Sequence, residues 1–411
     1  MVRIEPFAGV RPRPADAASV ASPPYDVLSS GEAREMVAGN PLSFLHVGKP
    51  EIDLPPGIDL YDDAVYAKGR ENFRRLLDSG VLRQDKQKCF YIYRQVWGSH
   101  EQTGIMAAAS TDDYLADRIK KHELTREEKE LDRLRHIETL SAQTGPVFLA
   151  YKQRDDIDEL CRQAMKTTPE YDFVTDDGVR QILYVVSDTS LVAAFAAAFK
   201  SIPCLYVADG HHRSASAVRI KQARAAANPD HSGDEDYNFF LSVIFPHNQL
   251  KILSYNRLVR DLAGMSASEF LHRLEKEFSL QKTELKSPEK MHDFCLYLDG
   301  QWYLLTARSG SFPENDPVAA LDVSILQTNV LAPLLGIENP RTDQRIDFVG
   351  GIRGAEELEN RVNSGDFRLA FSLFPTTIEQ LFAVADRGAM MPPKSTWFEP
   401  KLKDGMVVHL I

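Results

Sequence analysis

The stretch Asp209-Gly-His-His-Arg213 combines a carboxylate, a glycine and three nitrogen-bearing side chains. The apolar run Ile202 to Val207 before it predicts a short buried strand, and the pattern from Ser214 to Ala227 predicts a helix. The first N–H groups of a helix lack intrahelical acceptors, and the helix dipole adds partial positive charge there. Such a strand-to-helix junction favours a bound anion, so the stretch predicts phosphate recognition.

Each residue of this stretch has an expected role. Asp209 caps the helix or binds Mg²⁺, Gly210 lets a ligand approach the backbone, and His211, His212 and Arg213 contact phosphate. The alternative is an ordinary Asp-Gly turn followed by a solvated arginine. Chelation of one ion by both histidines is disfavoured, because successive helix residues point about 100° apart.

A second reactive group, Lys121, His122 and Glu123, precedes a strongly charged segment that predicts a helix. Thr125 and Glu128 match the spacing of a helix capping box, which places the group on a loop before the helix. A cation, an imidazole and a carboxylate can together orient a phosphate and take a proton. We therefore expect Lys121 to bind phosphate and His122 and Glu123 to be catalytic, with a solvated charged loop as the alternative.

Three other places carry polar side chains on stiffened backbone or at a strand end. Proline pairs precede two of them, at Tyr25 and at Lys394, and an expected strand precedes Asn256. The expected roles are a second candidate base at Asp26, substrate contacts from Tyr25, Asn256 and Arg257, and phosphate contacts from Lys394, Ser395 and Thr396. Surface turns that only satisfy local backbone are the alternative in each case.

The elements that must position these residues alternate between helices and strands. A chain of 411 residues exceeds a typical single core, and its 43% hydrophobic content is ordinary for a folded protein. We expect a mixed α/β fold with two packed lobes and the phosphate site in the cleft between them. The expected lobes are 1–200, with the Tyr25-Asp26 and Lys121–Glu123 motifs, and 201–411, with the Asp209 and Lys394 motifs; one intertwined unit is the alternative.

Local patterns predict individual elements. The segment Ser43 to Val47 predicts a strand, and Thr189 to Lys200 predicts an amphipathic helix. Turn signals predict paired strands at Cys89 to Trp97 with Thr103 to Ala109, Tyr171 to Thr175 with Arg180 to Val186, Asn238 to Phe245 with Leu250 to Tyr255, and Leu296 to Leu298 with Gln301 to Thr306.

Charge and composition exclude several classes of protein. The net charge of −11 argues against a broad nucleic-acid surface, which requires a basic footprint. The four cysteines are scattered without a C-x-x-C pair, which predicts reduced thiols. The N-terminal stretch lacks the apolar core of a signal peptide, and no apolar run is long enough to cross a bilayer. A cytoplasmic location is therefore expected.

Five ordered motifs together resemble one family along essentially the whole chain. They are Ser22-Pro-Pro-Tyr-Asp-Val27, Lys121-His-Glu-Leu-Thr125, Ala208-Asp-Gly-His-His-Arg213, Asn256-Arg257 and Met391-Pro-Pro-Lys-Ser-Thr396. The chain thereby resembles the bacterial and archaeal domain-of-unknown-function 1015 family, whose members are often labelled SpoOJ/ParB-like. Its Asp-Gly-His-His-Arg element is also similar to that of the ParB/sulfiredoxin-like superfamily of nucleotide-binding proteins, and in particular of its free L-serine kinases.

The resemblance implies a fold and an activity. It implies a ParB/sulfiredoxin-like core, nucleotide phosphate contacts from Asp209 to Arg213, and the place of the kinases' catalytic glutamate for Glu123, although the spacing between these elements is not clearly kept. The implied reaction moves a phosphoryl group from ATP or ADP, with Mg²⁺, to a small hydroxyl compound, free L-serine first. The alternative is a non-catalytic nucleotide-binding switch or regulatory protein. DNA is not an expected partner, since no helix-turn-helix module is evident, and a homodimer is compatible with the resemblance.

Overall fold

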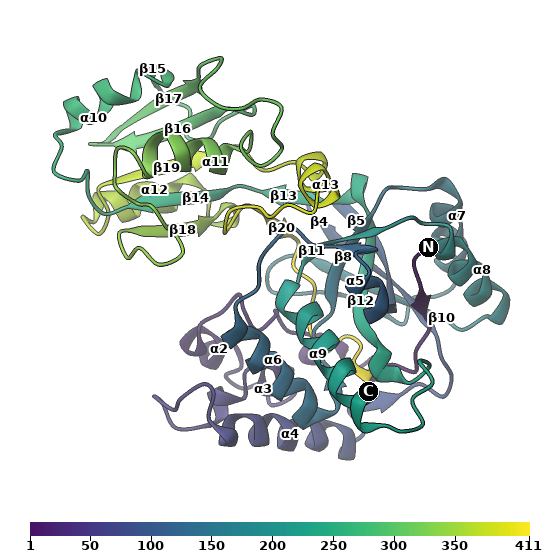
Figure 1. Ribbon diagram of the computed structural model, residues 1–411. Helices are drawn as coiled ribbons and strands as arrows, with labels where there is room; N and C mark the ends of the chain where they lie inside the picture. The colour runs from purple at the N-terminus through teal and green to yellow at the C-terminus, as the bar shows by residue number, and fades with distance from the viewer. The chain divides into compact units, whose positions relative to one another are not determined.

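The computed structural model describes all 411 residues, which form two compact units (Figure 1). The first unit is Met1–Leu250 with Pro400–Ile411, and the second is Lys251–Glu399. This division differs from the expected boundary near Lys200. The strand that follows Lys200 hydrogen-bonds to strands on both of its sides within the first unit, so a boundary there would cut a continuous sheet.

The first unit contains a nine-stranded sheet in the order β6-β11-β8-β12-β5-β4-β10-β9, with β1 paired to β5. The strands are β1 (Ile4–Glu5), β4 (Phe90–Trp97), β5 (His100–Ser110), β6 (Ile119–Lys120), β8 (Val147–Tyr151), β9 (Tyr171–Val174), β10 (Arg180–Val186), β11 (Leu205–Asp209) and β12 (Phe239–Pro246). The pairs β6 with β11 and β8 with β12 are parallel, and the other pairs are antiparallel. The sheet is therefore mixed, and the predicted hairpins β4–β5 and β9–β10 are confirmed.

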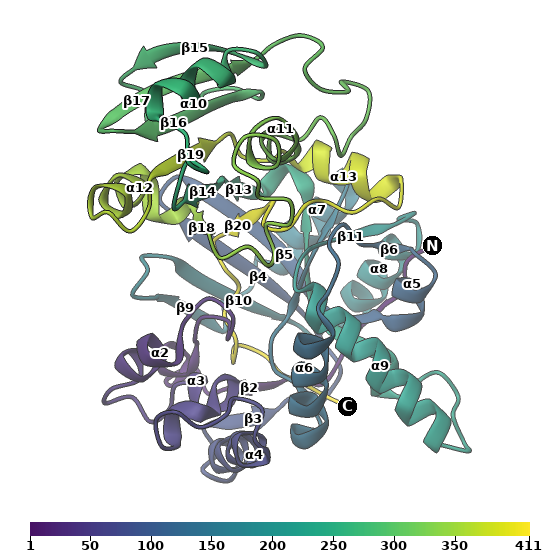
Figure 2. The same ribbon diagram turned by 60° about the vertical axis from the view of Figure 1, so that its left-hand side comes forward.

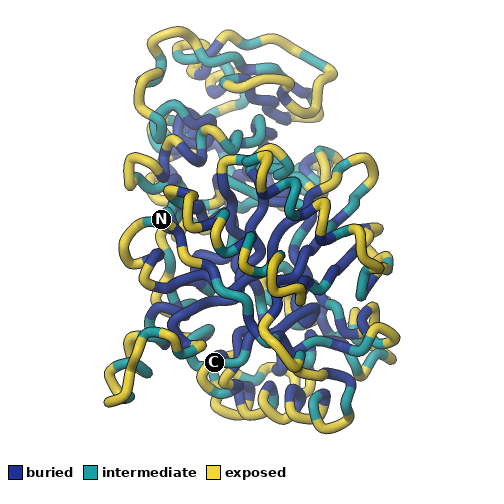
Figure 3. Tube along the Cα trace, turned by 90° about the vertical axis from the view of Figure 1, so that its right-hand side faces the viewer, coloured by how far each residue is buried: buried dark blue, intermediate teal, exposed yellow.

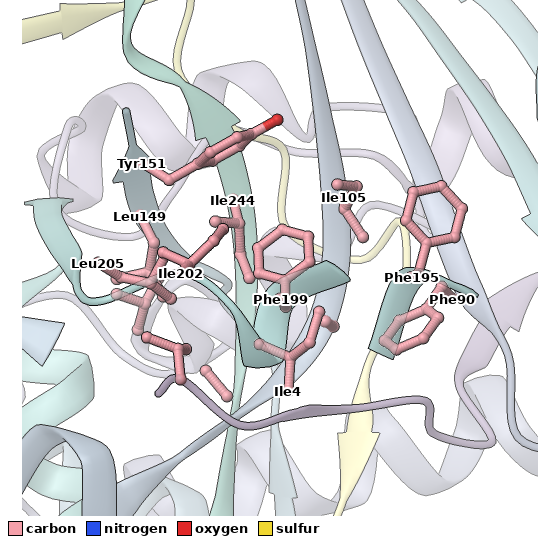
Figure 4. Close-up of a cluster of buried hydrophobic side chains, with 14 of the residues drawn as sticks. Ile4, Phe90, Ile105, Leu149, Tyr151, Phe195, Phe199, Ile202, Leu205 and Ile244 are labelled. Atoms are coloured by element: carbon pink, nitrogen blue, oxygen red, sulfur yellow. The ribbon is translucent and has the colours of Figure 1, made fainter. Parts of the chain in front are cut away.

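Two helices, α7 (Asp155–Ala164) and α8 (Thr189–Lys200), pack against this sheet. Phe195 and Phe199 of α8 meet Ile4, Phe90 and other strand residues in one apolar cluster (Figure 4). Burying one such large apolar side chain stabilises a fold by roughly 1.5–3 kcal/mol. The strands of the sheet are consequently buried along most of their length, as Figure 3 shows.

The remaining elements of the first unit are shorter, apart from three long helices. The helices are α1 (Ala17–Val20), α2 (Ser30–Met36), α3 (Leu45–Gly48), η1 (Pro50–Asp53), α4 (Asp63–Asp78), α5 (Thr111–Leu115), α6 (Glu127–Leu140), α9 (His211–Ala227), η2 (Asp236–Asn238) and η3 (His247–Gln249). The small strand pairs are β2 (Val10–Pro12) with β3 (Leu82–Gln84), and β7 (Ala142–Gln143) with β21 (His409–Leu410). Helices α6 and α9 pack side by side (Figure 2), and the Ser216 hydroxyl donates to the Glu130 carbonyl at 2.9 Å.

The strand predicted at Ser43 to Val47 is wrong, because Phe44 is the N-cap of α3, which begins at Leu45. Phe44 and Val47 both belong to the apolar cluster that also contains Phe73 and Leu76 of α4, whereas Leu45 packs in a separate cluster. Residues three apart share a face of a helix, not of a strand. A short apolar run does not distinguish the two structures by its periodicity alone.

The segment Pro400–Ile411 returns to the first unit and is held there by backbone pairing. Val408 and Val10 exchange N–H···O bonds of 2.7 and 2.9 Å, and Asp404 and Ser22 exchange bonds of 2.9 and 3.1 Å. Strand β21 pairs with β7 a few residues later. These contacts fix the side chains of the segment relative to α9 and to the N-terminal loops.

The second unit is built on an antiparallel six-stranded sheet in the order β15-β17-β16-β19-β14-β18, with β13 and β20 paired separately. Its strands are β13 (Lys251–Leu253), β14 (Tyr255–Val259), β15 (Phe278–Thr283), β16 (Asp293–Leu298), β17 (Gln301–Ala307), β18 (Ile346–Gly350), β19 (Leu369–Leu373) and β20 (Trp397–Glu399). Its helices are α10 (Ala267–Leu274), α11 (Asp322–Leu326), η4 (Gln327–Leu331), η5 (Gly351–Arg353), α12 (Gly354–Asn363) and α13 (Ile378–Asp386).

Two predictions about strand pairing around this unit have opposite outcomes. The β16–β17 hairpin is confirmed, and its turn residues Asp299 and Gly300 both have positive φ, as its turn type requires. The pairing predicted across Pro246 is wrong, because β12 pairs with β5 and β8, and β13 pairs with β20.

Both units mix helices and strands, so the mixed α/β class is confirmed. None of the helices combines the length and apolar character needed to cross a membrane.

Gly104 of β5 provides a test of how tightly the first sheet is packed. A Cβ at this position would lie 2.7 Å from Val243 Cγ1 and 2.8 Å from a Phe245 ring carbon. We expect Gly104→Ala to lower the free energy of unfolding by roughly 1–3 kcal/mol through overpacking. Gly31→Ala in α2 is the control, since the nearest atom lies 3.9 Å away and alanine favours a helix. Equal urea denaturation midpoints for the two variants would contradict this packing.

Candidate functional site

Parallel pairing of β6 with β11 brings two of the predicted motifs together. Ile119 pairs with Leu205 and Lys120 pairs with Tyr206, so both strands run in the same direction. The loops that follow them therefore leave the sheet at the same edge. One loop carries Lys121 to Glu123, and the other carries Gly210 into α9.

Gly210 forms the turn between β11 and α9. Its φ of 93° and ψ of 30° lie in the left-handed region that favours glycine, and it is the N-cap of the helix. Helix α9 begins at His211, three residues before the predicted start, so His211, His212 and Arg213 all lie in the first turn. No side chain caps this 17-residue helix, which leaves its first N–H groups for an anion.

Asp209 does not cap α9. Its Oδ1 accepts the Gly210 N–H at 2.7 Å, and its Oδ2 accepts from Lys401 Nζ at 2.9 Å. Burial acts to raise the pKa of Asp209, but the charges of Lys401 and Arg213 outweigh it and hold the pKa below its usual range. The ammonium of Lys401 occupies the position where a cation would neutralise this carboxylate, so Asp209 does not fit the expected role of Mg²⁺ ligand.

Arg213 carries a buried charge. Its guanidinium donates to the Pro146 carbonyl and lies 3.9 Å from the Asp26 carboxylate, and its side chain is 10% exposed. Burial acts to lower the pKa of Arg213, but Asp26, Asp209 and Asp404 together raise it above the ordinary value. Burial also raises the pKa of Asp404 to about 7, against the opposing charge of Arg213. The Tyr25-Asp26 motif and the Arg213 motif therefore meet in the first unit.

Tyr25 lines a small cavity beside this arginine. The cavity has a volume of about 20 Å³, and Arg133, Arg213 and Asp404 also line it. The Arg133 guanidinium lies 3.8 Å from the centre of the Tyr25 ring, and burial raises the pKa of the Tyr25 hydroxyl. A space of this size holds about one water molecule and not a substrate. Tyr25, Arg133 and Asp404 therefore pack around Arg213 and do not form a substrate pocket.

His122 and His211 form an edge-to-face pair with ring centres 4.5 Å apart. The His122 backbone N–H also donates to His211 Nε2 at 3.5 Å, a long contact. Burial lowers the pKa of His122 to about 4, and burial followed by the neighbouring His122 lowers the pKa of His211 well below its usual value. Both imidazoles are neutral at pH 7.

The other groups of the two motifs surround this pair. The Glu123 carboxylate lies within 4.8 Å of ring nitrogens of both His122 and His211. His212 Nε2 accepts the Arg126 backbone N–H at 3.1 Å, and burial lowers its pKa. Lys121 Nζ lies 4.5 Å from the centre of the Tyr114 ring. Imidazoles, a carboxylate and an ammonium therefore gather at the start of α9.

The predicted capping box before α6 is wrong. Thr125 Oγ1 donates to the Glu130 carboxylate and not to the backbone, and Arg126 is the N-cap without a side-chain bond. The shift arises because Arg126 takes extended backbone angles and the helix begins one residue later than the motif requires. The loop position predicted for Lys121 to Glu123 holds, since Glu123 lies outside regular structure.

Five predicted site residues, Asn256, Arg257, Lys394, Ser395 and Thr396, lie in the second unit. Arg257 is buried and donates to the carbonyls of Tyr255 at 2.7 Å and Lys394 at 3.0 Å, and burial lowers its pKa to about 9. The Ser395 hydroxyl donates to the Pro392 carbonyl at 2.6 Å.

The Asn256 side chain accepts the Leu373 N–H at 3.1 Å. Arg257, Ser395 and Asn256 thus bond to backbone groups, and the partners of Asn256 and Arg257 include residues 117 and 137 positions away. Their substrate and phosphate contacts stay predictions. Lys394 lies with Nζ 5.4 Å from the centre of the Tyr255 ring, and Thr396 is half-buried. A meeting of Lys394 with the Gly210 turn stays a prediction.

Three charged residues of the first-unit site were missed by the sequence patterns. Lys401 and Asp404 come from the returning C-terminal segment, and Arg133 comes from the middle of α6. The only local signal was Asp404-Gly405, whose glycine has a φ of 81°. No spacing rule connects Lys401 with Asp209, since the two are 192 residues apart.

The neutral state of His122 gives an expected pH dependence. The unfolded imidazole binds a proton near its ordinary pKa of 6.5, whereas the folded one does so near 4. The free energy of unfolding should therefore fall as the pH falls between these values, by at most about 1.4 kcal/mol per pH unit for this group. We expect the slope to be smaller in His122→Asn, measured by urea denaturation at several pH values. Equal slopes in the two proteins would show that His122 is not held neutral.

Among known proteins, the sequence matches the family described as "Protein of unknown function (DUF1015)" over residues 4–324. This range includes the motifs at Tyr25, Lys121, Asp209 and Asn256, whereas the Lys394 motif lies outside it. The predicted family is thus confirmed over most of the chain and not over its whole length. No curated protein matches the sequence.

Solved structures give distant matches. A free serine kinase mutant in complex with AMP is 13% identical and aligns with 73% of this chain and 91% of its own, at a TM-score of 0.37. A conserved hypothetical protein from Pyrococcus furiosus is 15% identical and aligns with 75% of this chain and 95% of its own, at a TM-score of 0.35.

SbnI from Staphylococcus aureus, truncated at its C-terminus, is 12% identical and aligns with 73% of this chain and 85% of its own, at a TM-score of 0.37. TM-scores of this size do not establish a shared fold, so the ParB/sulfiredoxin-like core stays a prediction. The family match spans more than half of the sequence, and the chain therefore belongs to the DUF1015 family of proteins of unknown function.

Proposed function

We propose that the first unit binds the phosphates of ATP or ADP at the start of α9 and transfers a phosphoryl group to a small hydroxyl compound, with free L-serine as the first candidate. The observation that carries this proposal is the uncapped start of α9 at Gly210, with Arg213 in its first turn and the Glu123 carboxylate close to His211. Phosphoryl transfer depends mainly on positioning and on charge stabilisation, which these groups supply.

The start of α9 suits a phosphate for two reasons. The unbonded N–H groups of the first turn donate hydrogen bonds, and the helix dipole adds partial positive charge. Gly210 has a φ of 93°, which favours glycine, and a Cβ there would lie 3.3 Å from Arg213 Nε, so the glycine keeps the Arg213 side chain beside this turn. Arg213 adds a full positive charge beside this turn, and the charge of Lys121 acts on the neighbouring His211.

Glu123 is the proposed base. Its carboxylate takes the proton of the acceptor hydroxyl, the hydroxyl oxygen forms a bond to the terminal phosphorus, and the bond from that phosphorus to the bridging oxygen breaks, which releases ADP or AMP. Asp26 is less suited to this role, because it lies 3.9 Å from the cationic Arg213. The nucleotide is expected as its Mg²⁺ complex, in which the ion neutralises phosphate charge.

A nucleotide-binding regulator is the second candidate. Arg213 is already surrounded by the carboxylates of Asp26, Asp209 and Asp404, and a bound phosphate would compete with them for its charge. Such competition could change the loop that carries Asp26 without any chemical step. This protein would bind nucleotide but show no turnover with any acceptor.

Arg213→Ala tests the phosphate contact. Loss of a charge-assisted contact costs about 1.5–3 kcal/mol, so we expect the Kd for ATP or ADP to rise roughly tenfold to a hundredfold in calorimetric titration. Arg224→Ala removes the same charge from the last turn of α9 and is the control. Thermal denaturation of both variants checks that they are folded. Unchanged affinity in folded Arg213→Ala would overturn the assignment.

Glu123→Gln tests the base. It keeps the shape of the side chain and removes its basicity, so we expect unchanged nucleotide affinity and a turnover about 10²–10⁴-fold lower. Glu128→Gln, on the exposed start of α6, is the control. The assay uses Mg·ATP or Mg·ADP with a panel of amino acids and polyols. Nucleotide binding without turnover on any acceptor would favour the regulator over the kinase.

A further inference from the structure

His122 has an unusual environment for a buried polar side chain. The residue is 1% exposed, and neither of its ring nitrogens has a hydrogen-bond partner. The Val207 backbone lies near enough to oppose the lowering of the His122 pKa, but it does not reach hydrogen-bond geometry. A buried polar group without a partner costs about 1–3 kcal/mol, so an orphaned imidazole calls for a ligand.

The side chains around this imidazole are metal ligands. One ligand atom each from His122, Glu123 and His211 lie within 4.8 Å of one another. We propose that these three residues bind a divalent transition-metal ion of the Zn²⁺ class. Two imidazoles and a carboxylate form a donor set known from zinc sites that keep a fourth position open.

The fold explains why two distant motifs supply this set. The parallel β6–β11 pair places the loop after Lys120 beside the start of α9, and the ring planes of His122 and His211 are 89° apart. The two rings therefore lie in edge-to-face contact, and one nitrogen of each lies within 4.8 Å of the other and of the Glu123 carboxylate. His211 and His212, by contrast, are neighbours on one helix. His212 Nε2 accepts the Arg126 N–H at 3.1 Å, whereas the contact of the His122 N–H with His211 Nε2 is longer, at 3.5 Å.

The donor atoms select the class of metal. Imidazole nitrogen suits Zn²⁺, Co²⁺ and Ni²⁺, whereas Mg²⁺ prefers oxygen ligands and keeps several waters. Burial also favours the neutral imidazole, the form that binds metal. The three ligand atoms lie within 4.8 Å of one another, a separation from which at most small side-chain rotations reach the coordination distances of a tetrahedral zinc ion.

Under the proposed function, an ion bound at this site affects catalysis. A Glu123 carboxylate bound to an ion is not available to accept a proton from a hydroxyl group. Occupancy of the site should therefore inhibit phosphoryl transfer, while nucleotide binding at the start of α9 is retained. The metal site itself does not depend on nucleotide binding.

The test is metal binding by the full chain without nucleotide. Chelator-treated protein is titrated with Zn²⁺ in competition with a chromogenic chelator, and Co²⁺ binding is followed by visible absorption. We expect stoichiometric binding of Zn²⁺ and Co²⁺ absorption bands typical of low coordination number. His122→Ala and His211→Ala should each weaken Zn²⁺ binding by at least about tenfold. His212→Asn is the matched control and should bind as the wild type does.

Glu123→Gln is a second test that does not depend on the folding of the histidine variants, because Glu123 is a half-buried loop residue whose replacement disturbs packing less. It should also weaken Zn²⁺ binding, and Zn²⁺ should raise the Tm of the wild type but not of this variant. Zn²⁺ affinity equal in the wild type, His122→Ala and His211→Ala would overturn the metal site. Turnover that depends on Glu123 in a protein that binds no Zn²⁺ would contradict the metal site and leave the kinase proposal standing. Zn²⁺ binding without turnover on any acceptor would contradict the kinase proposal and leave the metal site standing.

Discussion

The buried charge of Arg213 is the constraint on which much of the first unit depends. An unpaired guanidinium in a low-dielectric interior is strongly unfavourable, so the chain must bring compensating groups to it. Asp26 comes from the N-terminal loops, Asp209 from the end of β11 and Asp404 from the returning C-terminal segment. The Pro146 carbonyl completes the set. Four separate parts of the chain therefore have to be in place before this one charge is stable.

The same charges determine the character of the α9 start. Asp209 Oδ1 accepts the Gly210 N–H, and Oδ2 accepts from Lys401, so both carboxylate oxygens are already hydrogen-bonded. This pairing leaves the helix dipole and the first N–H groups without a side-chain cap. The start of α9 therefore still has the free N–H groups and the positive dipole end that favour an anion, although the Asp209 carboxylate lies next to it.

Local patterns predicted the parts of the fold that local energetics decide. The strand, turn and helix around Gly210, helix α8 and three hairpins depend on periodicity and turn residues, and these are visible in the sequence. The parallel pairing of β6 with β11, the position of Lys401 and the unit boundary depend on contacts between distant segments. The strand prediction for the short apolar run around Phe44 was wrong for a related reason. Only the apolar clusters that its residues join decide between helix and strand.

Successive residues of a helix point about 100° apart, so His211 and His212 are poorly placed to share one ion, but this rule applies only within one element. The second imidazole comes from a loop 89 residues earlier, as the contact between the His122 backbone and the His211 ring shows. Spacing rules describe ligands on one helix or one hairpin. They do not describe a set that two strand ends bring together.

The first unit is discontinuous in the sequence, since Pro400–Ile411 belongs to it and Lys251–Glu399 does not. A ribosome therefore releases the sheet and α9 well before the residues that complete them. Throughout synthesis of the second unit, Asp209 lacks Lys401, and Arg213 lacks Asp404. The nascent first unit thus lacks one partner of each of these two buried charges until synthesis ends. Lys401 and Asp404 reach Asp209 and Arg213 only when the returning segment pairs with Val10 and Ser22.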